Sequence, residues 1–381
     1  GVQTCALPIF AAHANLLVNY CVAVQPGDRV FINSALAAKP LALETYRHVL
    51  RAGGHPLLSW SDEQFDEVLL KEGTEEQIRF VHEPLRHVYE HYDAIIGLRG
   101  ATNTRALSGV DPQREQWRSA AGHPLRRALM QRAAAREARW VGTLFPTAAQ
   151  AQEADMSLAE YEDFVYRACF VDQPDPVASW RAVSAQQQKL VDWLRGRREV
   201  RVEGPNAELT LSIAGRTFIN SDGRRNMPSG EIFTGPVEDS VNGWVRFTYP
   251  AIYSGREVEG IELRFEQGRV VEASARKNGA FLQKVLDTDP GARYLGEFAI
   301  GTNDGIDRFT KSILFDEKIG GTIHMAVGAG YPDTGSTNES AVHWDMICDM
   351  RDGGRIWVDG ELFYESGRFT ILEEPIVGDH A

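Results

Sequence analysis

The chain has 381 residues, a formal net charge of −13, 43% hydrophobic residues and 24% charged residues. This length exceeds what one ordinary hydrophobic core organises, so we expect two domains. The composition is typical of a globular protein, and no apolar run is long enough to cross a bilayer. The acidic balance argues against nucleic acid or an anionic membrane surface as the main partner, because both carry negative charge.

The four cysteines lie far apart in the sequence and form no CxxC pair. They are Cys5, Cys21, Cys169 and Cys348. This scatter argues against both a disulfide framework and a thiolate zinc site. It favours a reducing compartment, and we therefore predict a cytoplasmic location.

The first nine residues do not resemble a natural start of a protein. Their letters, GVQTCALPI, resemble the translation of a common sequencing-library adapter. A signal peptide is a poor alternative, because the stretch has no basic residues ahead of its apolar positions. We therefore predict that residues 1–9 are not native and that the first domain begins at residue 10.

From residue 10 to about residue 145, short apolar runs alternate with helical patterns. Strands are predicted at 29–33, 55–60, 92–98 and 140–144, and helices at 40–52, 75–82 and 124–139. Alternation of this kind is typical of a mostly parallel sheet covered by helices. Residues 155–195 are predicted to form a helical connector. We assign residues 10–195 to an N-terminal α/β domain that includes this connector.

After Gly196, short strand-like runs with turns between them replace the helical patterns. One helix is predicted at 279–286, and the pair Asp289-Pro290 is predicted to start another. We assign residues 196–381 to a β-rich C-terminal domain. The predicted fold class is therefore α/β followed by α+β.

The α/β half invites a nucleotide-binding interpretation, but the required loops are absent. No predicted strand leads into a GxGxxG turn, and the sequence contains no GxxxxGK[ST] motif.

His82, His87 and His91 are interpreted as surface residues, because Pro84 is expected to break a helix there. The arginines at positions 126, 127, 132, 136 and 139 are interpreted as a solvated or internally paired helical face.

Two histidines of the C-terminal half stand in runs that suit metal-binding strands. His324 lies in the run TIHM, and His343 and Asp345 lie in the run AVHWD. On a strand, residues two apart point to the same face, about 6–7 Å from each other. His343 and Asp345 could then reach a common divalent ion while Trp344 turns the other way. For one isolated pair, the alternative is a buried histidine hydrogen-bonded to a carboxylate.

Two glutamates of the same half lie at the ends of apolar runs beside turn residues. Glu231 lies between a Pro/Gly turn and the start of a strand, and alternation places Glu297 on the face of Ala299. Each one alone suits a solvated charge at a sheet edge. Together with the histidines and Asp345 they make five donors, enough for two divalent ions that share a carboxylate.

Four motifs of the C-terminal half occur in a fixed order: NMPSGEIFTGP, LGEFAIGTN, LFDEKIGGTIHMAVGAGY and NESAVHWDMI. Their order and spacing resemble the motif set of the thermophilic aminopeptidase T family of metallopeptidases, also called leucyl aminopeptidases. The resemblance runs from about Phe10 to the C-terminus and includes the connector run DQPDPVASW. Each motif is weak alone, and the four together are specific.

The resemblance implies a set of site residues. The implied metal ligands are Glu231, Glu297, His324, His343 and Asp345, with Glu297 as the bridging ligand. Tyr331, seven residues after the first histidine of the set, is the implied catalytic residue. The segment between Glu317 and His324 is longer than in some relatives, which leaves a role for Glu317 open. On residue chemistry alone, packing beside Pro332 is an equal alternative for Tyr331.

The resemblance implies a metal-dependent aminopeptidase that removes N-terminal residues from short peptides. Two divalent ions (zinc, cobalt, manganese or magnesium) would lower the pKa of a shared water, and Tyr331 would donate a hydrogen bond to the developing oxyanion. Either Glu231 or Glu317 would carry the proton to the leaving amine. The resemblance also suggests a homodimer. The alternatives are another dimetal amidohydrolase on the same ligands and a non-catalytic binding protein stabilised by metal.

Overall fold

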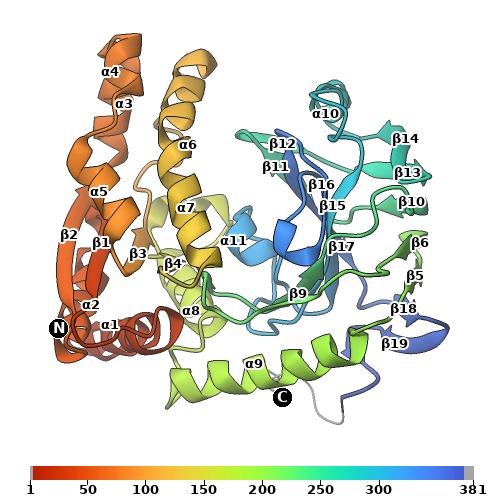
Figure 1. The fold of residues 1–381 in the computed structure, drawn as a ribbon, viewed down its shortest axis with the longest axis horizontal. Helices are drawn as coiled ribbons and strands as arrows, with labels where there is room; N and C mark the ends of the chain where they lie inside the picture. The colour runs from red at the N-terminus through yellow and green to blue at the C-terminus, as the bar shows by residue number, and fades with distance from the viewer. Residues whose placement is uncertain (1–2, 373–381) are drawn as a thin grey trace. The chain divides into compact units, whose positions relative to one another are not determined.

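The computed structural model of the chain describes residues 3–372, with side chains described from residue 8 onward. Contacts divide it into two compact units, which Figure 1 colours in chain order. The first unit ends at Ala178 and takes in the later segment Gly223–Pro228, and the second unit contains the rest. The prediction that residues 1–9 are not native concerns side chains that mostly lie outside the described range, so it stays a prediction.

The sequence places the boundary between domains at residue 196, whereas contacts place it near the start of helix α9 (Pro176–Leu194). Gln187 gives the reason for this difference. Its side-chain amide donates to Asn220 Oδ1 at 2.6 Å and to the backbone carbonyls of Ser221 and Glu231. These hydrogen bonds attach α9 to the β-rich unit.

The first unit contains the parallel sheet that the alternating pattern predicts. All its strand pairs are parallel, in the order β2-β1-β3-β4-β8. The strands are β1 (Arg29–Ala35), β2 (His55–Ser61), β3 (Ala94–Arg99), β4 (Arg139–Leu144) and β8 (Asn226–Met227). The helices are α1 (Gln3–Leu16), α2 (Lys39–Arg51), α3 (Glu63–Glu72), α4 (Glu75–Arg79), α5 (Glu83–His91), α6 (Pro112–Ala134), α7 (Ala148–Glu153) and α8 (Leu158–Ala168), with a π-helical turn at Leu17–Cys21 and a 3-10 turn at Leu36–Ala38.

Two of the helix predictions for this unit are wrong. Pro84 does not break a helix but lies in the first turn of α5, where its missing N–H has no helical partner to lose. The prediction that His82, His87 and His91 are exposed is nevertheless confirmed. Helix α6 starts at Pro112 instead of residue 124, because Asp111 accepts a hydrogen bond from the amide of Gln113 at 2.9 Å and caps the helix there.

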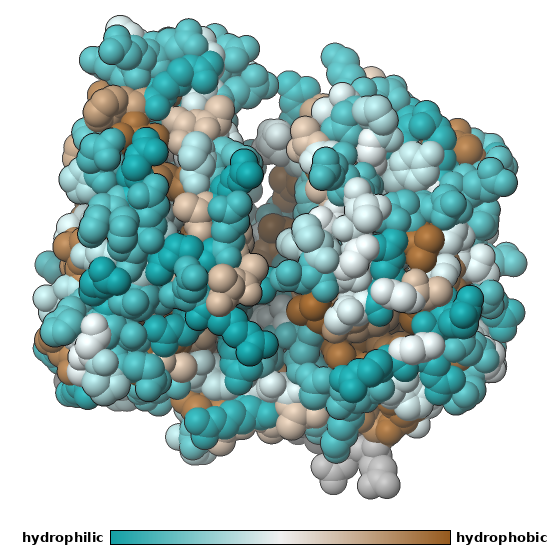
Figure 2. All heavy atoms as spheres, in the orientation of Figure 1, coloured by the Kyte–Doolittle hydropathy of each residue, from teal (hydrophilic) through white to brown (hydrophobic). Residues whose placement is uncertain are grey.

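Arginines near the C-terminal end of α6 are paired within the protein. Arg132 donates to the backbone carbonyls of Tyr89 and Tyr92, and Arg139 Nη2 lies 2.8 Å from a carboxylate oxygen of Asp28. The face of the molecule drawn in Figure 2 is mostly hydrophilic, with hydrophobic residues in small patches. None of the described helices is both long enough and apolar enough to cross a membrane.

The second unit consists of antiparallel sheets, as the β-rich pattern predicts. One sheet has the strand order β14-β13-β10-β6-β5-β18-β19-β20, another the order β17-β16-β15-β9-β7, and β11 pairs with β12. The strands are β5 (Glu199–Gly204), β6 (Ala207–Ser212), β7 (Ile219–Ser221), β9 (Glu231–Thr234), β10 (Asn242–Arg246), β11 (Ala251–Tyr253), β12 (Arg256–Val258), β13 (Glu262–Glu266), β14 (Arg269–Ser274), β15 (Leu295–Gly301), β16 (Thr322–Gly328), β17 (His343–Asp349), β18 (Arg355–Val358), β19 (Glu361–Glu365) and β20 (Arg368–Phe369). Besides α9, its helices are α10 (Gly279–Leu286), α11 (Ile313–Asp316) and a 3-10 turn at Pro332–Thr334.

The antiparallel five-stranded sheet, β17-β16-β15-β9-β7, lies in the interior of this second unit. Every residue of its strands β9, β15 and β16 is buried. Because these strands are buried, a charged side chain on any of them is buried too, and its charge needs a partner.

One helix prediction for this unit is wrong. Asp289-Pro290 begins a turn and not the predicted helix, because Asp289 Oδ1 accepts hydrogen bonds from the amides of Gly291 and Ala292.

Candidate metal centre

The five predicted ligands share one face of the five-stranded sheet. In an antiparallel sheet, opposing residues share a face, and so does every second residue along a strand. The opposing pairs that connect the five are Glu231–Gly301, Ala299–His324, Glu297–Ala326, Ala326–Asp345 and Gly328–His343. Trp344 turns to the other face, as predicted, and its ring lies 5.2 Å from that of Tyr253.

The polar ends of these side chains lie close together. His324 Nε2 is 3.4 Å from Glu231 Oε2 and 3.5 Å from Glu297 Oε1. His343 Nε2 is 3.5 Å from Glu297 Oε2 and 3.6 Å from Asp345 Oδ1. The two oxygens of the Glu297 carboxylate therefore face two different imidazoles.

These separations fit ligands of a common ion better than they fit hydrogen bonds. A good N–H···O bond has a heavy-atom distance of about 2.9–3.0 Å. Two ligands that each lie about 2.0–2.1 Å from a tetrahedral ion are about 3.3–3.4 Å apart. Three site atoms, Glu231 Oε2, His324 Nδ1 and Asp345 Oδ1, are buried and have no hydrogen-bond partner among the described residues. Buried polar atoms left unpaired are unusual, and a bound cation would satisfy the carboxylate oxygens.

A contact outside the five fixes the ring of one ligand. His343 Nδ1 lies 2.8 Å from the backbone carbonyl oxygen of Ala329, so this nitrogen carries the proton and donates it. Nε2 is then left with a lone pair that faces Glu297 and Asp345. Metal-binding histidines are typically oriented in this way, through a hydrogen bond from the ring nitrogen that does not bind the ion.

The pKa values show how strongly the site favours added positive charge. Burial raises the pKa of Glu231 to about 7, and the nearby carboxylates of Glu317 and Glu297 act in the same direction. Burial also raises the pKa of Glu297. For His324, burial disfavours the charged ring, but the carboxylates of Glu297 and Glu231 outweigh it and raise the pKa to about 9. In the absence of an ion, the site therefore attracts protons.

Two further charged residues lie beside the five, and one of them was not predicted. Lys318 is fully buried, and its ammonium contacts Glu317 Oε1 and lies 3.9 Å from Glu231 Oε1. Glu317, left open in the sequence interpretation, has a ligand atom within 4.8 Å of those of His324 and Asp345. Sequence reasoning treats a lysine as a surface residue by default, so only its place directly after Asp316 and Glu317 of the motif could have suggested that Lys318 is buried beside the site.

Tyr331 lies at the edge of the site. Its ring contacts the imidazole of His343 edge to face, at 5.3 Å between centroids, and the ring of Phe233 at 5.4 Å. The Tyr331 residue is 42% exposed, and partial desolvation of its hydroxyl together with the nearby Glu297 and Asp345 carboxylates raises its pKa. The hydroxyl therefore keeps its proton at neutral pH and can donate a hydrogen bond.

The metal-free protein should lose stability as pH rises from about 5 to 9. The raised pKa of Glu231 (about 7, ordinarily 4.5) gives stability below pH 4.5 that is lost as pH rises through 7. The raised pKa of His324 (about 9, ordinarily 6.5) gives stability below pH 6.5 that is lost as pH rises through 9. Thermal unfolding of chelator-treated and zinc-supplied protein should therefore show a difference in Tm that widens with pH. A constant or shrinking difference would contradict this electrostatic account.

Comparison with known proteins places the chain among metallopeptidases. The family model described as thermophilic metalloprotease (M29) matches residues 9–369. Aminopeptidase 2 of Geobacillus stearothermophilus is 30% identical over 386 residues, which cover 89% of this chain and 91% of the relative. Aminopeptidase T of Thermus thermophilus is 32% identical over 258 residues, 61% of each protein.

A solved structure shows the same fold. Wild-type AmpT from Thermus thermophilus superposes with a TM-score of 0.83 at 22% identity, covering 95% of this chain and 99% of that one. The parallel sheet followed by a β-rich unit, predicted from the pattern of elements, is thereby confirmed as the fold of this group.

Proposed function

Because the chain belongs to the thermophilic metalloprotease (M29) family, we propose that it is a metal-dependent aminopeptidase that removes N-terminal residues from short peptides. The relatives reported above carry the name aminopeptidase, which supports the exopeptidase reaction. The observation that carries the proposal is the Glu297 carboxylate, whose two oxygens face His324 and His343 at 3.5 Å each.

The donor set supports two divalent ions. Glu231, Glu297 and His324 form one group of three close donors, and Glu297, His343 and Asp345 form a second. Glu297 belongs to both, as a bridging ligand would. Mixed imidazole and carboxylate donors suit zinc, cobalt or manganese, and magnesium is also compatible with the carboxylates. When bound, such ions polarise a carbonyl and lower the pKa of water.

The protein's own groups then have distinct tasks. Four carboxylates meet in the site, and their negative charge would be balanced by the two divalent ions. The neutral α-amine of a peptide has a lone pair, which an ion held there would accept. Lys318 donates to Glu317 Oε1, which leaves Oε2 to accept a proton from the attacking water and deliver it to the leaving amine. The Tyr331 hydroxyl, which keeps its proton, donates to the oxyanion that develops on the peptide carbonyl.

Hydrolysis of two matched substrates tests this function. Metal-loaded protein should release p-nitroaniline from Leu-p-nitroanilide and lose that activity on chelation, because the site depends on its ions. Acetylation of the substrate amine should reduce the rate by about 100-fold or more, because an amide nitrogen has no free lone pair for a bound ion to accept.

Each alternative predicts a different result. Equal turnover of the acetylated substrate would favour another dimetal amidohydrolase. A chelation-dependent Tm without turnover of any peptide would favour a non-catalytic binding protein.

We further propose that the enzyme is a cytoplasmic homodimer. The location rests on the scattered cysteines of the sequence. The dimer is supported by β2, which among the described strands pairs only with β1 and carries the exposed apolar side chains Leu57 and Trp60. An edge strand of this kind offers backbone groups and apolar surface to a second copy. A monomer mass by light scattering at micromolar concentration would rule the dimer out.

A further inference from the structure

The loop segment from Ala329 to Ser340, which is most of the connection between β16 and β17, supplies two groups to the candidate metal centre. The carbonyl oxygen of Ala329 accepts the hydrogen bond that orients His343. Tyr331, two residues later, packs its ring against the same imidazole. Whatever holds this loop in place therefore also sets the positions of a predicted ligand and of the predicted catalytic hydroxyl.

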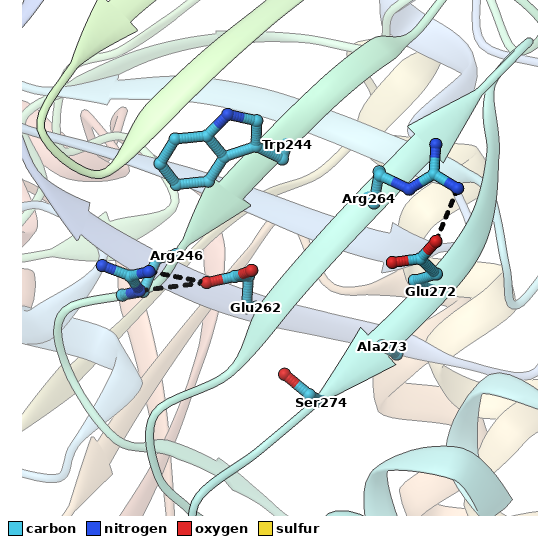
Figure 3. Close-up of a pocket in the computed structure, with 7 residues that line it drawn as sticks. All are labelled: Trp244, Arg246, Glu262, Arg264, Glu272, Ala273 and Ser274. Atoms are coloured by element: carbon cyan, nitrogen blue, oxygen red, sulfur yellow. Dashed lines mark hydrogen bonds and ion pairs between the residues drawn. The ribbon is translucent and has the colours of Figure 1, made fainter.

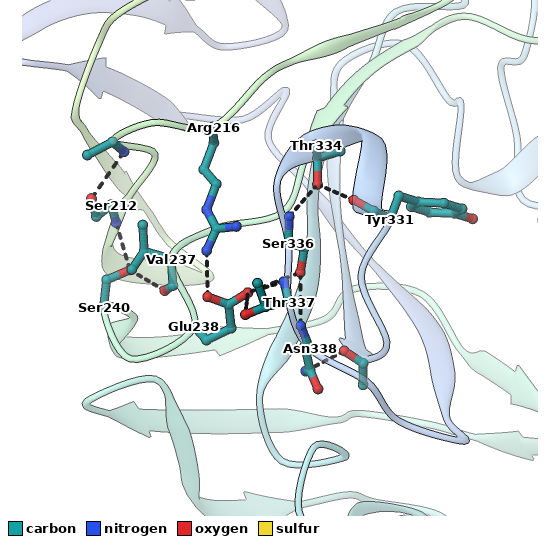
Figure 4. Close-up of polar contacts among 12 residues, drawn as sticks. Ser212, Arg216, Val237, Glu238, Ser240, Tyr331, Thr334, Ser336, Thr337 and Asn338 are labelled. Carbon is teal, nitrogen blue, oxygen red and sulfur yellow. Dashed lines mark hydrogen bonds and ion pairs between the residues drawn. The ribbon is translucent and has the colours of Figure 1, made fainter. Parts of the chain in front are cut away.

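Glu238 contacts this loop, and Figure 4 shows its carboxylate between Arg216 and the loop residues Ser336 and Thr337. Its Oε1 accepts three hydrogen bonds from the loop: from the Thr337 amide at 2.7 Å, the Thr337 hydroxyl at 3.1 Å and the Ser336 hydroxyl at 3.2 Å. Its Oε2 pairs with Arg216 Nη2 at 2.5 Å, and the two side chains are 25% and 9% exposed. A largely shielded carboxylate with four donors is a strong and directional anchor.

The hydrogen bonds continue from this anchor to Tyr331. The Ser336 amide donates to the Thr334 hydroxyl at 3.3 Å, and that hydroxyl donates to the backbone carbonyl of Tyr331 at 2.6 Å. The carbonyl of Thr334 accepts from the amide of Thr217, the residue after Arg216, at 3.0 Å. The segment Arg216-Thr217 therefore contacts the loop directly through the Thr217 amide and indirectly through the Arg216–Glu238 pair.

Close packing leaves the loop little freedom to shift. A Cβ added at Gly330 would lie 2.0 Å from Ser336 Oγ, and one added at Gly235 would lie 2.6 Å from Ser336 Cβ. Both distances are far below van der Waals contact. Ser336, which donates a hydrogen bond to Glu238, is therefore packed tightly between the backbones of Gly330 and Gly235. A displacement of Glu238 would consequently also displace the rest of the loop.

We propose that Glu238 is a positioning residue for the reaction, acting through loop 329–340 on the position of Tyr331. This inference rests on the proposed function, since it presumes that Tyr331 acts in catalysis. Glu238 itself belongs to none of the donor groups of the metal centre. Its loss should misplace the Tyr331 hydroxyl without removing a ligand.

A double-mutant cycle tests the proposal. Glu238→Ala should lower kcat by about 10- to 100-fold while metal content stays full, because small misplacements of catalytic groups have effects of this size. Tyr331→Phe should lower kcat by about 100-fold or more. In the Tyr331→Phe background, Glu238→Ala should cost less than about 3-fold, because the group it positions is already absent.

A conservative variant and a matched control complete the cycle. Glu238→Gln keeps an oxygen for Thr337 and Ser336 and should retain more kcat than Glu238→Ala in the same cycle. The control is Glu262→Ala, which removes the Arg246–Glu262 ion pair (2.9 Å, 53% and 43% exposed) from the outer face of the eight-stranded sheet (Figure 3). It should leave kcat unchanged in both backgrounds.

A structural measurement separates this proposal from the proposed function. Hydrogen exchange at the amides of residues 330–338 should become faster in Glu238→Ala and stay unchanged in Glu262→Ala. If the wild-type protein hydrolyses no peptide, the proposed function fails, and the exchange experiment still decides whether Glu238 anchors the loop. Equal losses of kcat in both backgrounds, or unchanged exchange in Glu238→Ala, would overturn the proposal.

Discussion

Glu297→Gln is expected to remove bound metal and peptidase activity together, with kcat/KM lowered by about 1,000-fold or more. The two carboxylate oxygens of Glu297 face His324 Nε2 and His343 Nε2 at 3.5 Å each. A glutamine offers only one oxygen, so it cannot serve both groups of donors. Divalent ions contribute several kcal/mol to stabilising the transition state, and each 1.36 kcal/mol corresponds to a factor of ten.

The same variant should remain folded. Glutamine has the size of glutamate, and the substitution removes the buried Glu297 carboxyl group. Burial and the nearby Asp345 carboxylate raise the pKa of that group, so its negative charge is unfavourable there. The metal-free variant should therefore unfold at a temperature equal to or above that of the metal-free wild type. Elemental analysis, turnover of Leu-p-nitroanilide and thermal unfolding check the three parts, with Glu262→Gln as the surface control. Full activity at full metal content would refute the assignment of Glu297.

Glu317→Gln is expected to lower kcat by about 100- to 10,000-fold while the metal stays bound. The Lys318 ammonium contacts Glu317 Oε1, and the glutamine oxygen can keep that contact. The amide cannot, however, accept a proton from water or pass one to the leaving amine. The side chain of Glu317 is 16% exposed, more than those of Glu231 and Glu297, which suits a group that exchanges protons with substrate and water.

Metal content decides between two roles for Glu317. Its carboxylate also lies within 4.8 Å of ligand atoms of His324 and Asp345, so a role as an additional ligand is the competing interpretation. Loss of metal together with activity would show that Glu317 is a ligand. Wild-type kcat at full metal content in Glu317→Gln would show that Glu317 neither transfers the proton nor binds the metal.

The resemblance of the four motifs to a known family implied the five donors, and the period of a strand explains part of the set. Two-residue alternation placed His343 and Asp345 on one face and Trp344 on the other, and the structure brings all five donors to one face of a single sheet. Alternation does not give strand order or register. These come from tertiary pairing, including the irregularity between Leu295 and Glu297, so no pattern could have put Glu231 beside His324.

Residues that act through distant partners escaped the sequence interpretation. Lys318 is a buried ammonium only because folding brings Glu317 and Glu231 to it. The pairing of Glu238 with a loop almost 100 residues away likewise has no local signal. In the first unit, α6 buries only Leu125 and Leu129, so its apolar periodicity was too sparse to locate its start.

The central claim is that side chains from β9, β15, β16 and β17 hold two divalent ions with Glu297 between them. Anomalous diffraction at the zinc edge, from crystals grown with zinc, tests it most directly. We expect two peaks about 3.5–4 Å apart, one beside His324 and one beside His343, with the Glu297 carboxylate contacting both. A single peak, or zinc bound away from these residues, would contradict the account.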